Sequence, residues 1–233
     1  MTHDGNHEPA FSIPTEFPFD WFKAMDFEFE RPRGQGFDWP DPYEALKNLP
    51  WLLKQANEEH DPGAAYKLFD LALCCSEQAE RPIPPGIQPL DCSPVNAWSV
   101  EERAAWMRLA ARGGYTTAAL ATLSAAEKSN APLEMRREMT KDAAIGLEIS
   151  ASRGSLEAAL ALATLLRDGD LIEADLPRSY AYFQVAAAAT SADAYSRHAG
   201  SVRERLKSSD LAIARSIQEK LAAALAANGR CNR

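Results

Sequence analysis

The sequence predicts an all-α fold made of antiparallel helix pairs, and three observations support this prediction. The stretch from Ala104 to Ala227 contains 33 alanines in 124 residues and few β-branched residues, a composition typical of helices. No segment alternates polar and apolar residues over the length of a strand. Breaks as short as Gly113-Gly114 separate the helical stretches, and such short connections place consecutive helices side by side.

Caps and breakers set the expected helix boundaries. Ser99 followed by Glu102 predicts a capping box, and Ser209-Asp210 predicts the start of the last helix. Glycines at Gly154 and Gly169 predict helix ends. The expected helices cover residues 42–58, 63–78, 99–113, 116–129, 135–153, 155–168, 176–190, 192–207 and 209–227.

Residues 1–41 form an aromatic, acidic N-terminal arm before the first expected helix. The arm holds seven of the nine phenylalanines, two tryptophans, and nine acidic against three basic residues. One interpretation is a capping arm that buries its rings against the first helices, because soluble proteins rarely expose a large apolar patch. The other is a docking arm that offers aromatic anchors to a partner, namely Phe17, Phe19, Trp21 and Phe22.

Three further segments lie outside the helix pairs. Residues 79–98 contain five prolines and predict a non-helical insertion, either an ordered excursion or a flexible flap. Residues 210–227 carry apolar side chains on one helical face, which predicts a C-terminal capping helix, with a dimerisation helix as the alternative. We therefore expect a monomer or a weak homodimer. Residues 228–233 are expected to form a tail.

The alanine-rich body contains a degenerate internal repeat. The segment Trp106–Leu120 aligns with the segment Gly146–Leu160, forty residues later, and a further copy places Tyr182 in the position of Trp106. A weaker early copy has His60 in the position of Gly114. Periods of this length with two helices each indicate an α-solenoid, here over residues 42–227. The best aligned residues are Ala111 with Ala151, Gly114 with Gly154, and Ala118-Ala119 with Ala158-Ala159.

This pattern resembles Sel1-like repeats, which are related to tetratricopeptide repeats, over about residues 42–206. The family pattern of an aromatic, two alanines, a glycine and an alanine is met by Trp106, Ala110, Ala111, Gly114 and Ala118. The inter-repeat loop of the family is echoed by Gly169, Asp175 and Tyr182, although Leu171 and Ser179 replace a glycine and an alanine. Gly146 departs further, because it stands in a bulky position. The resemblance implies a right-handed superhelix of about four helix pairs that acts as a scaffold or adaptor.

Charge and the repeat together point to a protein partner. The formal net charge of −8 and the pI of about 5.1 argue against nucleic acid as a partner. A peptide or a protein domain would lie in the concave face, and large or charged residues near the turns are candidate contacts. An alternative function is a specific inhibitor or immunity protein for a toxin enzyme, which would also be small and acidic. The candidate contacts are Arg112, Tyr115, Arg153, Tyr195 and Arg197.

Catalytic and metal-binding signatures are missing from the sequence. We expect no cofactor and no metal site, because no known catalytic motif or Cys/His metal spacing occurs. The remaining enzymatic hypothesis would use Cys74 or His60, although no motif connects them. Cys75 lies on an apolar helical stripe and is expected to be a core thiol, whereas Cys74 lies on the flank and could reach Cys92 in an oxidising compartment.

The sequence also carries no membrane or export signal. No stretch of 18 apolar residues occurs, and residues 1–17 have neither a basic start nor an apolar segment. We therefore expect no membrane partner and a cytoplasmic location by default. A periplasmic location stays open if the sequence is part of a longer chain.

Overall fold

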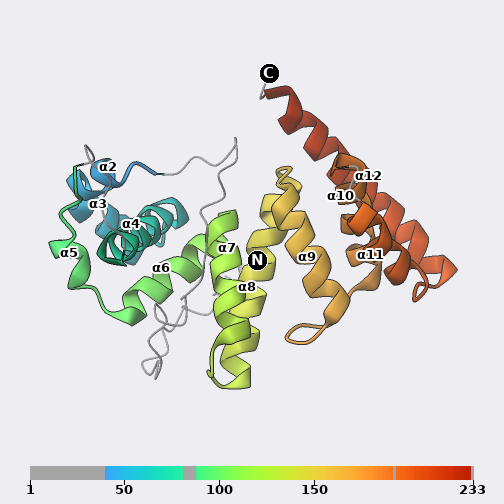
Figure 1. Cartoon of the computed structure of the whole chain (residues 1–233), viewed down its shortest axis with the longest axis horizontal. Helices are drawn as coiled ribbons and strands as arrows, with labels where there is room; N and C mark the ends of the chain where they lie inside the picture. Colours follow the sequence, from blue (N-terminus) through green and yellow to red (C-terminus); the bar gives the residue numbers. More distant parts are fainter. Residues whose placement is uncertain (1–39, 81–87, 191–192, 232–233) are drawn as a thin grey trace, which may run out of the picture.

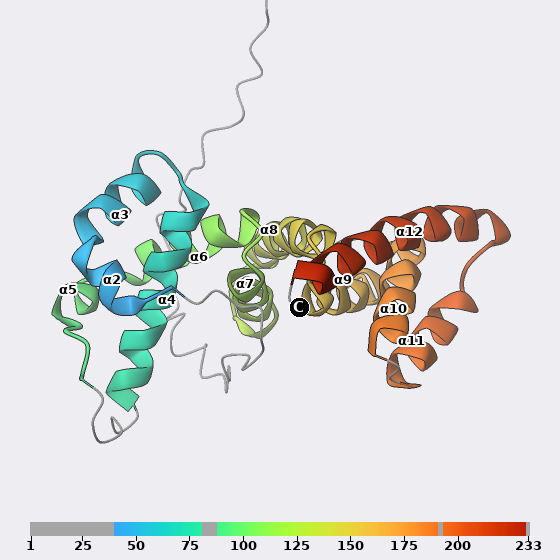
Figure 2. The same cartoon turned by 90° about the horizontal axis from the view of Figure 1, so that it is seen from above.

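The computed structural model describes residues 40–80, 88–190 and 193–231, and within these ranges the chain forms eleven helices and no strand. The all-α prediction is confirmed for this part of the protein. Helices α2 to α5 lie at one end of the long axis, α6 to α9 in the middle, and α10 to α12 at the other end, from which α12 runs back toward the middle (Figures 1 and 2).

The first helical unit contains one helix more than the sequence predicted. The expected helix at residues 42–58 is divided into α2 (Pro42–Lys47) and α3 (Leu49–Asn57), and α4 (Pro62–Glu80) packs against both. The break falls at Asn48 because Pro50, in the first turn of α3, has no N–H and its ring would clash with a preceding helical carbonyl. Two short helices therefore replace one long helix.

The proline-rich segment 79–98 is partly helical, which corrects the prediction that it would contain no helix. α4 continues to Glu80, and α5 (Ser93–Asn96) is a single turn with Pro94 in its first positions, where the missing N–H costs nothing. The segment is tied to α4 by Gln78, whose side chain accepts a hydrogen bond from the Leu90 N–H at 2.7 Å and donates to the Leu90 carbonyl at 2.9 Å.

Two long helix pairs form the middle of the molecule. They are α6 (Val100–Arg112) with α7 (Thr116–Lys128), and α8 (Leu133–Ser152) with α9 (Leu156–Asp168). α6 begins with the predicted capping box: the Glu102 N–H donates to the Ser99 hydroxyl at 3.1 Å, and the Ser99 N–H donates to the Glu102 carboxylate at 2.8 Å. These two bonds satisfy backbone donors that the first turn of a helix leaves unpaired.

The C-terminal part consists of α10 (Leu176–Thr190), α11 (Asp193–Arg203) and α12 (Ser208–Cys231). α10 packs on α9, α11 and α12, and α12 also touches α8. Residues 228–231 continue α12, so the predicted tail is helical there, because Gly229 weakens a helix interior without ending the helix. The alternative of a dimerisation helix for residues 210–227 stays untested.

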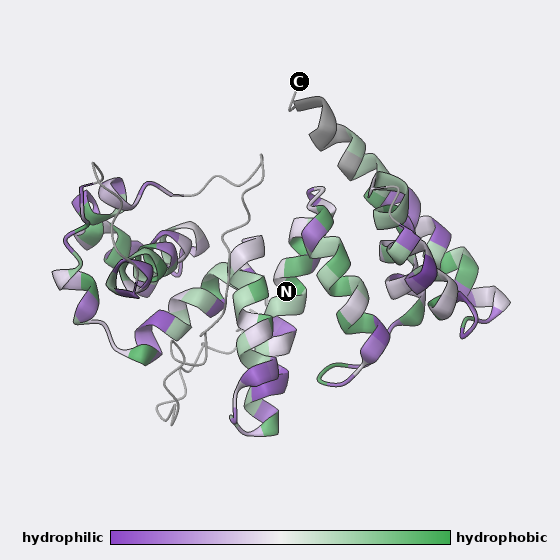
Figure 3. Ribbon diagram, in the orientation of Figure 1, coloured by the Kyte–Doolittle hydropathy of each residue, from purple (hydrophilic) through white to green (hydrophobic). Residues whose placement is uncertain are grey.

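Small residues dominate the interior. Trp106 is the largest fully buried side chain, and most other core residues of the middle pairs are alanine, leucine or methionine. Each helix carries both hydrophobic and hydrophilic residues, and hydrophilic residues gather at the start of α8 (Figure 3). Alanines let the helices approach closely, so a few large side chains suffice to fill the spaces between them.

The turns after α6 and α8 have the same geometry, forty residues apart. Gly114 and Gly154 have φ angles of 85° and 91°, in the left-handed region that favours glycine. Each turn makes the pair of hydrogen bonds of a Schellman motif. These bonds run from the N–H of Tyr115 to the carbonyl of Ala110 (3.3 Å) and from Gly114 to Ala111 (2.9 Å), and from Ser155 to Ser150 (3.0 Å) and from Gly154 to Ala151 (2.9 Å).

The corresponding turn after α3 is related but wider. His60, which stands in the glycine position of the repeat, also has a positive φ, of 52°. The next N–H, from Asp61, donates to the Gln55 carbonyl at 3.0 Å, six residues back rather than five. The first turn therefore shares the left-handed residue but contains one residue more.

Replacing Gly114 by valine should destabilise the protein by more than about 1 kcal/mol. A β-branched residue is strained at a φ of 85°, and its Cβ would lie 2.9 Å from the Cβ of Ile149. The free energy of unfolding from urea denaturation measures the effect. His60→Gly is the matched control, because it relieves a left-handed conformation and should leave the stability equal or higher. An unchanged unfolding curve for Gly114→Val would show that Gly114 does not need its left-handed conformation.

Candidate protein-interaction surface

The helix turns of neighbouring pairs lie against one another along one edge of the molecule. A Cβ on Gly113 would clash with the Pro62 ring, and a Cβ on Gly63 would lie 3.0 Å from the Tyr115 hydroxyl. We call this the turn edge, and it is formed by Pro62–Gly63, Gly113–Thr116 and Ser150–Ser155.

Hydroxyl groups connect the second and third turns of the turn edge. The Ser150 hydroxyl donates to the Gly114 carbonyl at 2.7 Å and lies 2.7 Å from the Thr116 hydroxyl. The Thr116 hydroxyl lies 3.4 Å from that of Ser155. These bonds fix one turn relative to the next, so residues exposed on this edge have defined mutual positions.

Three of the candidate contact residues belong to the turn edge or adjoin it. Arg112 has a half-exposed side chain, and Arg153 is exposed with its guanidinium close to Gly114. Tyr115 stacks on Tyr66 of α4, with ring centroids 4.4 Å apart and an interplanar angle of 18°. Tyr115 therefore packs between two helix pairs. Only the part of its side chain that stays exposed is available to a partner.

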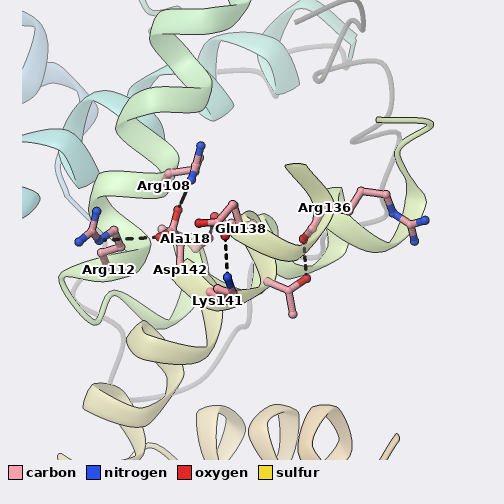
Figure 4. A network of polar contacts seen from close by, with 9 residues as sticks. Arg108, Arg112, Ala118, Arg136, Glu138, Lys141 and Asp142 are labelled. Carbon is pink, nitrogen blue, oxygen red and sulfur yellow. Dashed lines mark hydrogen bonds and ion pairs between the residues drawn. The ribbon is translucent and has the colours of Figure 1, made fainter. Parts of the chain in front are cut away.

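A buried ion pair lies beneath this surface and joins α6 to α8 (Figure 4). The Arg108 guanidinium donates to the Asp142 carboxylate at 2.7 Å, and both side chains are 9% exposed. The other Asp142 oxygen lies 3.8 Å from Arg112. Asp142 thus holds Arg108 by a direct hydrogen bond and lies within ion-pair distance of Arg112. Nothing in the repeat pattern indicated this pair, since its partners lie 34 residues apart in different helices.

A second polar link connects α8 to α10. Arg178 forms an ion pair with Glu148 at 2.7 Å, and buried Tyr182 follows Arg178 by one turn of α10. Burial raises the pKa of the Tyr182 hydroxyl, so the hydroxyl stays protonated in the folded protein. The other aromatic residue, Trp106, donates its indole N–H to the Asn57 side chain at 2.8 Å. This bond ties α6 to α3 and orients the indole ring.

The other two candidate contacts lie apart from the turn edge. Tyr195 and Arg197 are on α11, half-buried and exposed respectively. The same helix carries exposed His198, which stacks on Phe183 at 5.3 Å between ring centroids and lies 3.2 Å from Arg167. The candidate contacts therefore form two groups, at the middle and at the C-terminal end of the molecule. The aromatic candidates Phe17, Phe19, Trp21 and Phe22 lie outside the described residues.

Loop residues Gly169 and Asp175 have local structural roles. Gly169 ends α9 with a φ of 71°, and the Asp175 carboxylate accepts a hydrogen bond from the Arg178 N–H at 3.1 Å at the start of α10. The hydroxyl of Ser179 is fully buried and donates to the Ala163 carbonyl at 2.7 Å. Serine is accommodated in this alanine position because its hydroxyl has an acceptor.

The cysteine prediction is wrong in its partner. Cys75, expected as a core thiol, forms a disulfide with Cys92, while Cys74 is a buried thiol 3.8 Å from Asp70. The side of α4 that faces the loop carries both Cys75 and Gln78, which are one turn apart. Cys74 points about 100° away from that side, so it cannot reach the loop.

Cys74 and His60, either of which the enzymatic hypothesis would use, do not lie together. His60 precedes Pro62, the first residue of α4, and Cys74 lies about 18 Å further along that helix. A proton transfer between the two would require hydrogen-bond contact. Within the described ranges, no group of three or more His, Cys, Asp or Glu side chains is placed to hold a metal ion.

Burial raises the pKa of the Glu127 carboxyl above its ordinary value of 4.5; Asp168 and Asp170 add to this effect, while Lys128 and Arg136 oppose it. A raised pKa in the folded state means that stability is lost as the pH rises through it. Glu127→Gln should therefore be more stable than the natural chain at pH 7, with the difference vanishing in acid. Urea denaturation across this pH range measures it, with Glu219→Gln on exposed α12 as the control. A difference that grows toward acid pH would contradict the prediction.

None of the helices among the described residues has both the length and the apolar character needed to span a membrane. Comparison of the chain with models of known protein families, with curated proteins and with solved structures finds no match.

Proposed function

We propose that this chain is a protein-interaction module, a scaffold or adaptor whose Sel1-like helix pairs stack into a short right-handed superhelix. The observation that carries the proposal is the turn edge. Two turns forty residues apart share one backbone geometry and are joined to each other by hydroxyl groups. Turns of the same geometry that contact each other from one helix pair to the next are expected where structural repeats stack.

An elongated stack supports a binding function because it exposes much surface for its length. Helices of the middle pairs contact mainly their neighbours in the chain, and the molecule extends along one axis (Figure 2). Such stacks create an extended concave face suited to a peptide or a protein domain. The exposed arginines Arg153 and Arg197 come from different helix pairs. A partner that contacts both must therefore match the distance between these two pairs.

The experiment begins with cross-linking in the source cell and mass spectrometry to identify the partner. The purified partner is then titrated into the full chain by calorimetry. We expect Arg153→Glu with Arg197→Glu to weaken binding by at least about tenfold, because charge reversal at an interface introduces repulsion. Arg215→Glu with Lys220→Glu, which reverses two exposed charges on α12, is the matched control and should bind normally. Unchanged binding by the first variant would contradict the proposed surface.

A second function, inhibition of a toxin enzyme, is favoured by the net charge of −8. An acidic inhibitor would be attracted to a basic target by long-range electrostatics. The same purified complex separates the two functions. A partner enzyme whose activity falls in proportion to complex formation supports inhibition, whereas a partner that keeps its activity when bound supports a scaffold.

A further inference from the structure

A small pocket lies at the start of the described chain, between α2, α3 and α4. Its volume is about 240 Å³, below the roughly 300–1,000 Å³ of small-molecule sites. Buried Ala45 and Leu52 form the apolar part of its lining, and exposed Trp51 and Lys67 also line it. The size therefore fits a single side chain of another polypeptide better than a small-molecule ligand.

The polar part of the lining consists mainly of hydrogen-bond acceptors. The Tyr43 and Glu44 N–H groups both donate to the same Asp41 oxygen, Oδ1, at 2.9 and 3.4 Å, so Asp41 Oδ2 is left as an acceptor. Asn48 donates its side-chain N–H to the Glu44 carbonyl at 3.1 Å, which leaves Asn48 Oδ1 as an acceptor. The Glu44 carboxylate adds further acceptors, since an ionised carboxylate cannot donate. A side chain that suits this lining is therefore a hydrogen-bond donor.

Charge favours a donor that is also a cation. Asp41 and Glu44 line the pocket against the single base Lys67. Among the described residues, no ion pair joins Lys67 to either carboxylate, so neither is occupied by it. The surrounding segment, residues 40–80, contains eight acidic and three basic residues, a formal charge of −5. This excess of negative charge attracts a cationic group to the pocket.

Trp51 supplies an aromatic face for the same cation. Its side chain is 56% exposed, more than any other large hydrophobic residue exposed in the described ranges. A guanidinium is planar, carries its N–H donors in that plane and stacks on aromatic rings, whereas an ammonium is a compact and strongly hydrated point charge. An exposed indole beside carboxylate acceptors therefore favours arginine over lysine.

We propose that this pocket binds an arginine side chain of a partner protein, with the guanidinium stacked on Trp51 and hydrogen-bonded to the Asp41 and Glu44 carboxylates. The proposal rests on the proposed function in one respect only, namely that the partner is a protein. The pocket shares no residue with the turn edge. The partner therefore presents a basic segment to the N-terminal end of the helical body.

The test titrates N-acetyl-arginine amide into the ¹⁵N-labelled full chain and follows the indole N–H resonances by NMR. The Trp51 resonance, assigned through its loss in Trp51→Phe, should shift until it saturates, while those of half-buried Trp98 and buried Trp106 should keep their positions. N-acetyl-citrulline amide, which has the same shape without the charge, is the matched control and should bind at least about fivefold more weakly. Equal affinities for the two probes, or no saturable shift, would overturn the proposal.

Variants of the lining separate the pocket from the general charge of the segment. Asp41→Asn with Glu44→Gln removes two charges and keeps the helix cap, and should weaken arginine binding by about fivefold. Glu58→Gln with Glu59→Gln removes two exposed charges of the same segment outside the pocket, and should change the affinity by less than about twofold. Lys67→Ala should strengthen binding, because it removes the one repelling charge. Equal weakening by the two acid pairs would overturn the proposal.

This test and the test of the proposed function can fail separately. A chain that binds its partner through Arg153 and Arg197 but ignores the arginine probe would keep the proposed function and lose this pocket. Saturable binding of the arginine probe at Trp51, in a chain whose Arg153→Glu and Arg197→Glu substitutions leave partner binding unchanged, would support the pocket and contradict the proposed surface.

Discussion

Gly146→Ala should destabilise the protein by about 1–3 kcal/mol, although alanine is the better helix former. A Cβ at this position would penetrate the Ala111 carbonyl group and lie 3.3 Å from the Cβ of Ala119. The first neighbour is backbone, so a side-chain rotation cannot relieve the clash, and α8 would have to move away from α6. The free energy of unfolding from chemical denaturation measures the loss.

Gly200→Ala is the matched control for this prediction. Gly200 also lies inside a helix, α11, but a Cβ there would meet nothing within 4 Å. The substitution should therefore stabilise the protein by about 0.5–1 kcal/mol through the helix preference of alanine. Opposite signs for the two variants identify the close approach of α6 and α8. Equal effects would mean that these two helices are not in backbone contact.

Asp142→Ala should cost about 3–5 kcal/mol, because it leaves the Arg108 guanidinium buried without its carboxylate. The Asp142 and Arg108 side chains are each 9% exposed, so water cannot take the place of the lost partner. Thermal or chemical unfolding of the full chain checks the size of the loss.

Two further variants test whether burial causes this effect. Glu138→Ala breaks the exposed ion pair with Lys141 one turn away, and should change stability by less than about 0.5 kcal/mol. Arg108→Met with Asp142→Leu removes both buried charges, and should recover most of the loss. A loss from Asp142→Ala no larger than that from Glu138→Ala would contradict a buried ion pair between α6 and α8.

Local features of the fold could be predicted from the sequence because they are encoded by adjacent residues. The capping box at Ser99 and the left-handed turn at Gly114 depend on side chains within one turn of the helix end. The break at Asn48 was missed although Pro50 signals it, since proline is tolerated both inside a first turn and at a helix start.

Contacts between helices could not be predicted in the same way. Gly146 looked like a departure from the repeat, and its reason, the Ala111 carbonyl, belongs to another helix. The disulfide between Cys75 and Cys92 required knowing which side of α4 faces the loop. Cys74 and Cys75 are neighbours in sequence and differ only in that direction.

The candidate interaction surface shows the same division. Repeat spacing placed Tyr115 and Arg153 near the turns, where both lie. The stacking of Tyr115 on Tyr66 and the ion pair between Arg112 and Asp142 join residues that are far apart in the sequence. Trp51 was not recognised because an exposed tryptophan on a short helix has no sequence signature of its own.

A crystal structure of the full chain tests the central claim, that the alanine-rich body is a stack of repeated helix pairs. Residues 100–128 should superimpose on residues 140–168 by a shift of forty positions, with Gly114 on Gly154 and both turns on one edge. A bundle in which this shift fails to superimpose the pairs, or in which the two turns lie on opposite sides, would contradict it.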